Sequence, residues 1–175
     1  MRAAWYEQQG PAETVLKVGE MPAPTAGPGE VRIRLAASGV NPADVKLRSG
    51  KSNYGHAFDR VIPNSDGAGI VDQAGPGVQP SWVGKRVWLV NGQRLGRAFG
   101  TAAEYIALPS KYVTELPDFV SFAEGATLGI PAMTAYHGVF ADGPVAGKTV
   151  LVTGGAGAVG AVVGLSFLAS PLSPI

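Results

Sequence analysis

Hydrophobic and polar positions along the first 110 residues follow the pattern of short β-strands. Residues 31–37, VRIRLAA, alternate apolar and polar side chains, as a half-buried strand does. Further short strands are predicted at 3–6, 14–19, 67–75, 84–90 and 102–109, with glycine- and proline-rich turns between them. Short strands spaced about every ten residues predict a β-barrel or a β-sandwich.

The pattern changes near residue 117. Residues 121–140 predict two helices separated near Pro131, and the Ser-x-x-Glu spacing at the start is that of a capping box. Residues 149–153, TVLVT, predict a buried strand that leads through glycines into an apolar helix. This order predicts a mixed β and α/β fold, with a β-rich domain over 1–118 and the start of a nucleotide-binding domain over 119–175.

The glycines after the last predicted strand fit the spacing G-x-G-x-x-G at Gly155, Gly157 and Gly160. In dinucleotide-binding folds this spacing allows a tight turn, a close approach to the pyrophosphate and close helix–strand packing. The alternative is an ordinary glycine-rich turn in a sheet protein. The acidic residue that would hold the ribose falls about twenty positions later, beyond Ile175, so the choice between NADH and NADPH stays open.

Composition narrows the function classes. The formal net charge of +1 argues against nucleic acid or an anionic membrane as a partner. The absence of cysteine excludes disulfides and thiolate metal sites. Residues 149–175 carry no charged side chain, which is also typical of a membrane span, but their glycines and prolines favour a buried strand and helix. No apolar leader follows Met1, so we expect a cytoplasmic protein without a membrane partner.

Five motifs in order point to a family. They are SGVNPAD with RSG at 38–50, IPNSDGAGIV at 62–71, GTAAEY at 100–105, GIPAMTAY at 129–136 and GKTVLVTGGAGAVG at 147–160. Together they resemble the medium-chain dehydrogenase/reductase superfamily, and most closely its quinone oxidoreductase (zeta-crystallin-like) branch. The resemblance implies a GroES-like β-barrel followed by the first βα unit of a Rossmann fold. It also implies NADPH as the cofactor, with NADH not excluded and no flavin, and a small quinone or enone as the substrate.

The same resemblance implies that no zinc is bound. Zinc-dependent members carry a cysteine ligand where this chain has Asn41, and a His-Glu pair where it has Ser65 and Asp66. A catalytic zinc needs about three protein ligands, and an amide and a hydroxyl are poor ones. We therefore predict a zinc-independent enzyme, in which Asp66 supports the barrel or its loop.

Three side chains are implied at the reacting end of the site. Asn41 would line the nicotinamide and substrate pocket and donate to a carbonyl, or else be an Asn-Pro turn residue with a local hydrogen bond. Thr134 would meet the nicotinamide carboxamide, or else bond back to its own helix. Tyr54 would donate to the substrate oxygen, or else be plain surface. The residues implied at the cofactor phosphates are Gly155, Gly157, Ala158, Val159 and Gly160. Arg94 and Arg97 are expected on a solvated hairpin face.

The end of the sequence departs from the family pattern. Residues 161–170 have no charged face, and SPLSPI at 170–175 is unlike the expected continuation. We therefore expect a chain that is truncated early in the Rossmann domain and binds NADPH weakly or not at all. The alternative function is a non-catalytic GroES-like binding or structural module. Apolar surface over 149–170 would then favour a homodimer or self-association.

Overall fold

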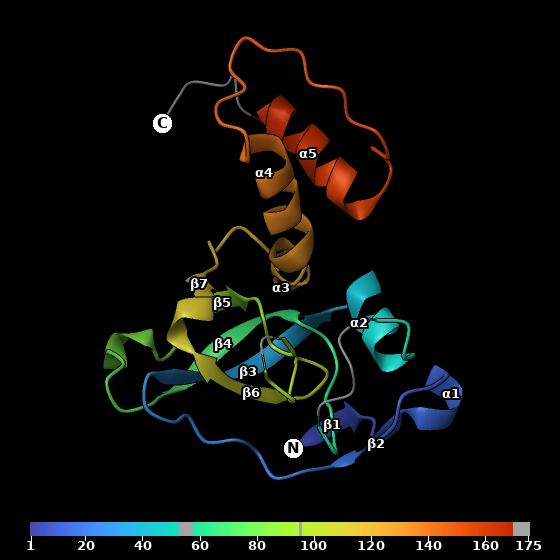
Figure 1. Ribbon diagram of the computed structural model, residues 1–175. Coiled ribbons are helices and arrows are strands. Elements are labelled where there is room, and N and C mark those ends of the chain that lie inside the picture. The colour runs from blue at the N-terminus through green and yellow to red at the C-terminus, as the bar shows by residue number, and fades with distance from the viewer. Residues whose placement is uncertain (53–57, 95, 170–175) are drawn as a thin grey trace. The chain divides into compact units, whose positions relative to one another are not determined.

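A computed structural model describes residues 1–52, 58–94 and 96–169 of the chain, with the backbone alone for 165–169. The chain divides into two compact units, Met1–Gly129 and Ile130–Ile175. The first unit holds the strands and the second holds two longer helices (Figure 1).

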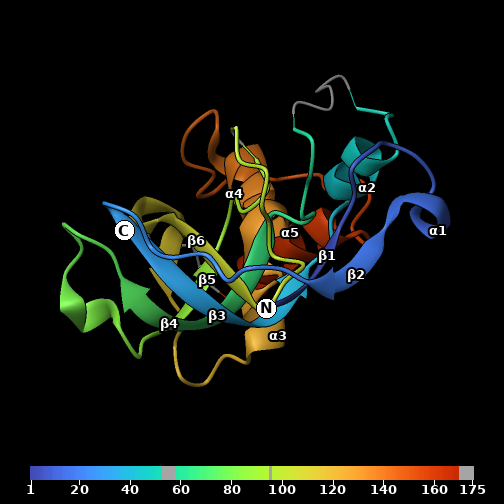
Figure 2. The same ribbon diagram turned by 90° about the horizontal axis from the view of Figure 1, so that it is seen from below.

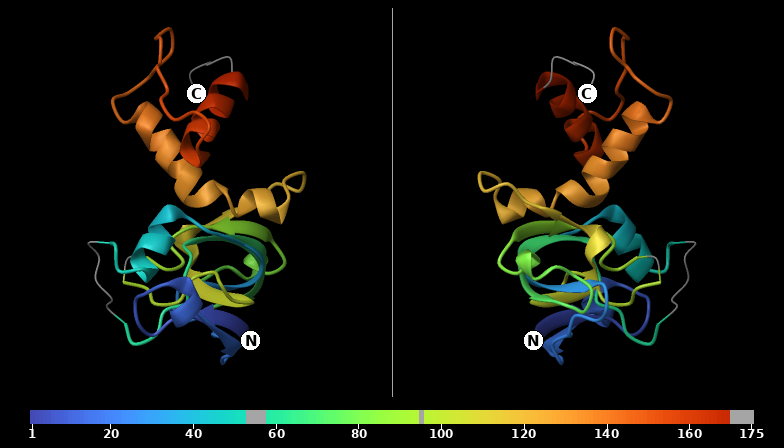
Figure 3. Two further views of the ribbon diagram at one scale, coloured as in Figure 1. Left: turned by 90° about the vertical axis from the view of Figure 1, so that its right-hand side faces the viewer. Right: turned by 90° about the vertical axis from the view of Figure 1, so that its left-hand side faces the viewer.

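The first unit is built on a five-stranded antiparallel sheet in the order β6-β3-β4-β5-β7. Its strands curve around a common interior (Figure 3), and the two longest, β3 and β4, lie side by side (Figure 2). A two-stranded sheet, β1 with β2, accompanies it. The strands are β1 Arg2–Trp5, β2 Lys17–Glu20, β3 Glu30–Gly39, β4 Asp66–Ala74, β5 Arg86–Leu89, β6 Tyr105–Pro109 and β7 Val113–Glu115.

The alternation read in the sequence of β3 is confirmed. Val31 and Ile33 are fully buried, while Arg32 and Arg34 point away from the core. Arg32 donates from Nε and Nη2 to the two carboxylate oxygens of Asp72 on β4, each at 3.0 Å. The interior is aliphatic and comes from five strands: Val31, Ile33, Val71, Val87, Leu89, Ile106, Leu108 and Val113.

The short helices of the first unit are α1 (Ala12–Val15), α2 (Pro42–Arg48) and α3 (Phe122–Gly125), with 3-10 turns at Pro80–Trp82 and Ser110–Tyr112. The predicted capping box of α3 is confirmed, because the Glu124 amide donates to Ser121 Oγ at 3.2 Å and the Ser121 amide donates to Glu124 Oε2 at 2.8 Å. The strand predicted over 14–19 is partly wrong. Its first residues belong to α1, and β2 begins only at Lys17.

The second unit contains α4 (Met133–Phe140) and α5 (Ala158–Ala169), which contact each other. A π-helical turn, Leu128–Ala132, precedes α4 and contains Pro131, where the sequence predicted a break. The strand predicted over 149–153 is wrong: these residues are irregular, and Leu151 is 88% exposed. A strand needs neighbours for its hydrogen bonds, and the described part of this unit has no other strand. Only the turn and the helix of the predicted βα unit have formed.

No helix within the described residues is long and apolar enough to span a membrane. The uncharged helix α5 has 12 residues, whereas a transmembrane helix needs about 20.

Candidate functional site

Asn41 stands where β3 ends and α2 begins. It is the N-cap of α2, with an extended backbone, and Pro42 supplies the pre-set first helical position. Its own amide donates to Oδ2 of Asp44 at 2.8 Å, the reciprocal arrangement of a capping box. The side chain is 5% exposed. The cap therefore fixes both the start of α2 and the backbone that carries Asn41.

The side chain of Asn41 is held from the neighbouring strand. Its Nδ2 donates to Oδ2 of Asp66 at 2.7 Å, and Asp66 is the first residue of β4 and 1% exposed. The pairing of the two strands explains the contact, because Gly39 lies directly opposite Asp66 and Asn41 follows two residues later. This hydrogen bond joins residues 25 positions apart, so it is not the local turn bond that was the alternative for Asn41, and the predicted contact of Asn41 with a ligand stays a prediction.

Asp44 is a second buried carboxylate that is hydrogen-bonded to Asn41. The Ser65 hydroxyl lies 3.3 Å from Oδ1 of Asp44 and 3.3 Å from the carbonyl oxygen of Gln93. Burial raises the pKa of Asp44, while hydrogen bonds from Asn41 and Ser65 and the charge of Arg94 oppose the rise. Asn41 thus lies between two buried acidic side chains.

A hydrogen-bonded chain of hydroxyl and amide side chains leads away from Asp66. Thr101 Oγ1 donates to the backbone carbonyl of Asp66 at 2.6 Å and lies 2.8 Å from Ser38 Oγ. Asn64 Nδ2 donates to the same Ser38 oxygen at 2.9 Å. Ser38, Asn64 and Thr101 belong to three of the five family motifs, but nothing in their spacing predicts that they meet.

Two glycines of the motifs are explained by close approach. A Cβ atom at Gly39 would lie 2.3 Å from the carbonyl oxygen of Ala126, and one at Gly129 would lie 2.2 Å from Oδ1 of Asp66. Both distances are far below van der Waals contact. The end of β3 and the segment after α3 therefore converge on Asp66.

The donor set at this place does not fit zinc. Asn41 and Asp66 are bonded to each other, and Ser65 offers a neutral hydroxyl. Among the described residues, no three His, Cys, Asp or Glu side chains gather as metal ligands would. Zinc independence remains a prediction.

The glycine turn lies in the second unit. Gly154 has φ +70°, and the Gly157 amide donates to its carbonyl oxygen at 2.9 Å. A Cβ atom at Gly160 would lie 2.3 Å from that oxygen and one at Gly157 would lie 3.3 Å from it, while Gly155 faces open space. Ala158 and Val159 open α5, so their amides belong to the first helical turn, where intrahelical partners are lacking. The local requirement for glycine is thus strongest at Gly160.

The other side chains predicted at the reacting end of the site are Thr134 and Tyr54. Thr134 is exposed on the first turn of α4, in the same unit as the glycine turn. Asn41 belongs to the other unit. Tyr54 lies outside the described residues, so its predicted role is untested.

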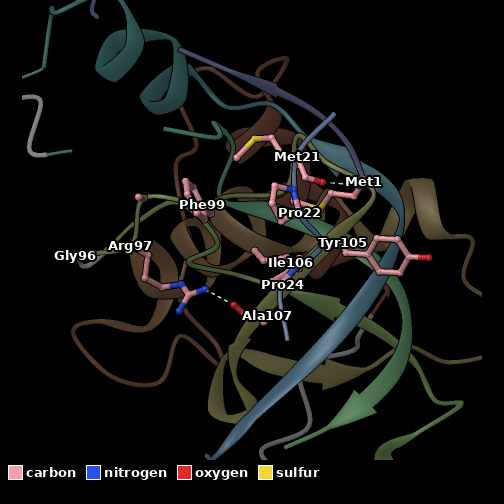
Figure 4. Close-up of a pocket in the computed structure, with 11 residues that line it drawn as sticks. Met1, Met21, Pro22, Pro24, Gly96, Arg97, Phe99, Tyr105, Ile106 and Ala107 are labelled. Atoms are coloured by element: carbon pink, nitrogen blue, oxygen red, sulfur yellow. Dashed lines mark hydrogen bonds between the residues drawn. The ribbon is translucent and has the colours of Figure 1, made fainter. Parts of the chain in front are cut away.

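A pocket of about 300 Å³ lies elsewhere on the first unit (Figure 4). Met1, Met21, Phe99 and Ile106 are among its lining residues, and none of the predicted site residues is. Arg97 also lines it, and the prediction of a solvated Arg97 is wrong: the side chain is half-buried and donates to the carbonyl oxygens of Gly92 and Ala107. Burial lowers its pKa.

Known proteins resemble the chain over most of its length. The alcohol dehydrogenase GroES-like domain family matches residues 27–118, just over half of the chain. The 2-methylene-furan-3-one reductase of Solanum lycopersicum is 34% identical over 166 residues, which are 93% of this chain and 43% of that protein. The quinone oxidoreductase of Rattus norvegicus is 34% identical over 161 residues, 91% of this chain and 47% of that protein.

The chain also resembles a solved structure. A mycobacterial protein in complex with NADPH has a TM-score of 0.79 and 30% identity, over 93% of this chain and 48% of that one. The chain thus spans about half the length of the proteins it matches. With its GroES-like domain and its quinone and enone reductase relatives, the chain belongs to the medium-chain dehydrogenase/reductase superfamily.

Proposed function

We propose that the protein acts in zinc-independent transfer of hydride from NADPH to a quinone or an activated alkene. The observation that carries this proposal is the buried hydrogen bond between Asn41 and Asp66, at positions where the resemblance expects metal ligands in zinc-dependent members. The reductase relatives and the NADPH-bound neighbour support the reaction class.

The glycine turn fits the phosphates of the cofactor. The missing side chains at Gly157 and Gly160 keep the turn narrow, and the first turn of α5 offers backbone N–H groups and the positive end of its dipole. When bound, NADPH supplies the hydride. In the second unit, the chain's part is to hold the pyrophosphate at residues 155–160. Asn41 and Thr134 stay the residues that the resemblance implies at the nicotinamide. NADH in place of NADPH is the alternative that binding measurements decide.

On the substrate side, Asn41 offers an oxygen more readily than a nitrogen. Its Nδ2 is directed at Asp66, whereas a carbonyl oxygen has two lone pairs and can accept from a ligand in addition to its cap. With its oxygen toward the ligand, Asn41 would accept rather than donate as first expected, so catalysis would rest on positioning and on other donors near the developing oxyanion. Tyr54 stays the predicted donor to the substrate oxygen.

The test is consumption of NADPH by the purified, EDTA-treated chain. Absorbance at 340 nm should fall when 9,10-phenanthrenequinone is added, and the rate should not respond to added zinc. Catalysis that requires zinc would refute the zinc-independent mechanism. A folded chain that never oxidises NADPH would favour the second candidate, a GroES-like binding module without catalysis.

A further inference from the structure

Asp66 is buried, ionisable and outside the reaction as described so far. It is 1% exposed, and its Oδ2 accepts from Asn41 Nδ2 at 2.7 Å. An ionised carboxylate can only accept hydrogen bonds, whereas an amide has one accepting end and one donating end. When it is ionised, Asp66 can therefore pair only with the nitrogen end of Asn41, which is the end that the hydrogen bond uses.

This pairing selects one of the two orientations that the Asn41 amide could adopt. We propose that Asp66 is a positioning residue, which turns the Asn41 nitrogen inward and leaves its oxygen as the group offered to a ligand. The proposal rests on the proposed function, in that Asn41 then lines the nicotinamide and substrate end of the site. Asp66 itself touches no ligand and acts through Asn41.

The surroundings make aspartate the residue that fits. The carboxylate of Asp66 already lies close to Gly129, since a Cβ atom at Gly129 would be 2.2 Å from Oδ1 of Asp66. A glutamate at position 66 has a longer side chain and would collide with Gly129. An asparagine would have nearly the same shape but would carry both a donor and an acceptor. Two facing amides can pair in two ways, so Asp66→Asn should keep the fold and lose the fixed orientation of Asn41.

Nuclear magnetic resonance of the full chain tests the orientation directly. The side-chain NH₂ group of Asn41 should exchange with solvent at least about tenfold more slowly than that of the half-buried Asn91, because it is buried and hydrogen-bonded to a buried carboxyl group. Asp66→Asn should remove this protection. Asp72→Asn is the matched control, an aspartate on the same strand that pairs with Arg32 instead. Unchanged protection in Asp66→Asn would overturn the proposal.

A double-mutant cycle tests the consequence for the reaction. Asp66→Asn should lower kcat by about tenfold with a smaller change in KM, and it should have no further effect in an Asn41→Ala background, since coupled residues are not additive. Additive losses would show that Asp66 acts by another route and would overturn the proposal. An inactive wild-type chain would count against the proposed function, while the exchange experiment would still decide the role of Asp66.

Discussion

A Cβ atom at Gly129 would lie 2.2 Å from Oδ1 of Asp66, so these two residues meet with no room for a side chain between them. Asp66 begins β4, and Gly129 closes the first compact unit. The same carboxylate accepts from Asn41 through its other oxygen. One buried acidic side chain therefore joins three segments that are far apart in the sequence.

Substitution of Gly129 should weaken the first unit. Gly129→Ala forces either the Asp66 carboxylate or the backbone to move, and overpacking of this kind costs about 1–3 kcal/mol of unfolding free energy. All three tryptophans, Trp5, Trp82 and Trp88, lie in the first unit, so urea unfolding followed by tryptophan fluorescence reports on it. Gly138→Ala, where a Cβ would meet nothing within 4 Å, should leave that transition unchanged. Equal stability of Gly129→Ala and wild type would contradict the close contact.

The stability of the first unit should carry a pH dependence from Asp44. Burial raises the pKa of Asp44, so the folded chain holds this proton to higher pH than the unfolded chain does. The contribution to stability is therefore complete below the ordinary pKa of 3.8 and declines as the pH rises through the raised value. Asp44→Asn should remove this decline when urea unfolding is measured at a series of pH values above 3.8. A parallel decline in the variant would assign the effect to another group.

The pKa of Glu7 is shifted in the opposite direction to that of Asp44, below its ordinary value. Hydrogen bonds from Lys17 and then Arg60 lower the pKa of Glu7 to about 2. Carbon-detected titration of the carboxyl group should show this value, and Lys17→Met should raise it, because the largest cause is removed. Lys111→Met, which removes a cation beside Tyr112, should leave the titration unchanged. A midpoint near 4.5 in the wild type would mean that the ion pairs do not persist in solution.

The glycine turn should tolerate no side chain at its third glycine. Gly160→Ala brings a methyl group against the Gly154 carbonyl oxygen, so the turn must open and the amides of α5 must shift. We expect NADPH binding to fall by at least about tenfold as followed by cofactor fluorescence, on the assumption that one or two charge-assisted hydrogen bonds are lost. Gly164→Ala lies further along α5 in open space and should bind as the wild type does. Equal binding by Gly160→Ala would remove the turn from the cofactor site.

Self-association through 149–170 should depend on the exposed apolar residues of the second unit. Leu151 is 88% exposed, and Val150, Val152 and Val159 are also exposed. Apolar surface of this kind favours association, so Leu151→Ser should lower the mean mass measured by light scattering at high concentration. Val18→Ser changes an apolar residue that is 66% exposed in the first unit and is the matched control. A monomeric wild type at every concentration would contradict the prediction.

The sequence predicted those features that depend on local pattern. Alternation located β3, a capping box located α3, and glycine spacing located the turn before α5. The strand β7 was missed because three residues, Val113–Glu115, are too few to show alternation. Residues 149–153 have the composition of a strand, but a strand also needs neighbours, which no local pattern can supply.

The candidate site also combines features that the sequence predicts with features that depend on distant parts of the chain. The motif order located Asn41, and the absence of cysteine argued against zinc. The partners of Asn41 depend on how β3 pairs with β4, a long-range register that the sequence alone did not specify. The polar hairpin around Arg97 predicts a solvated side chain, yet its guanidinium group donates to the carbonyl oxygens of Gly92 and Ala107. Such a contact depends on tertiary packing around a long side chain that can bury its stem.

The most direct test of the proposed hydride transfer is to follow the hydrogen itself. The EDTA-treated chain is incubated with 1-octen-3-one and NADPH carrying two deuterium atoms at C4 of the nicotinamide, and the product is analysed by mass spectrometry. The hydride goes to the β-carbon of the enone and a proton from water goes to the α-carbon. Direct hydride transfer predicts 3-octanone with one deuterium. A product without deuterium, or no product from a folded chain, would contradict it.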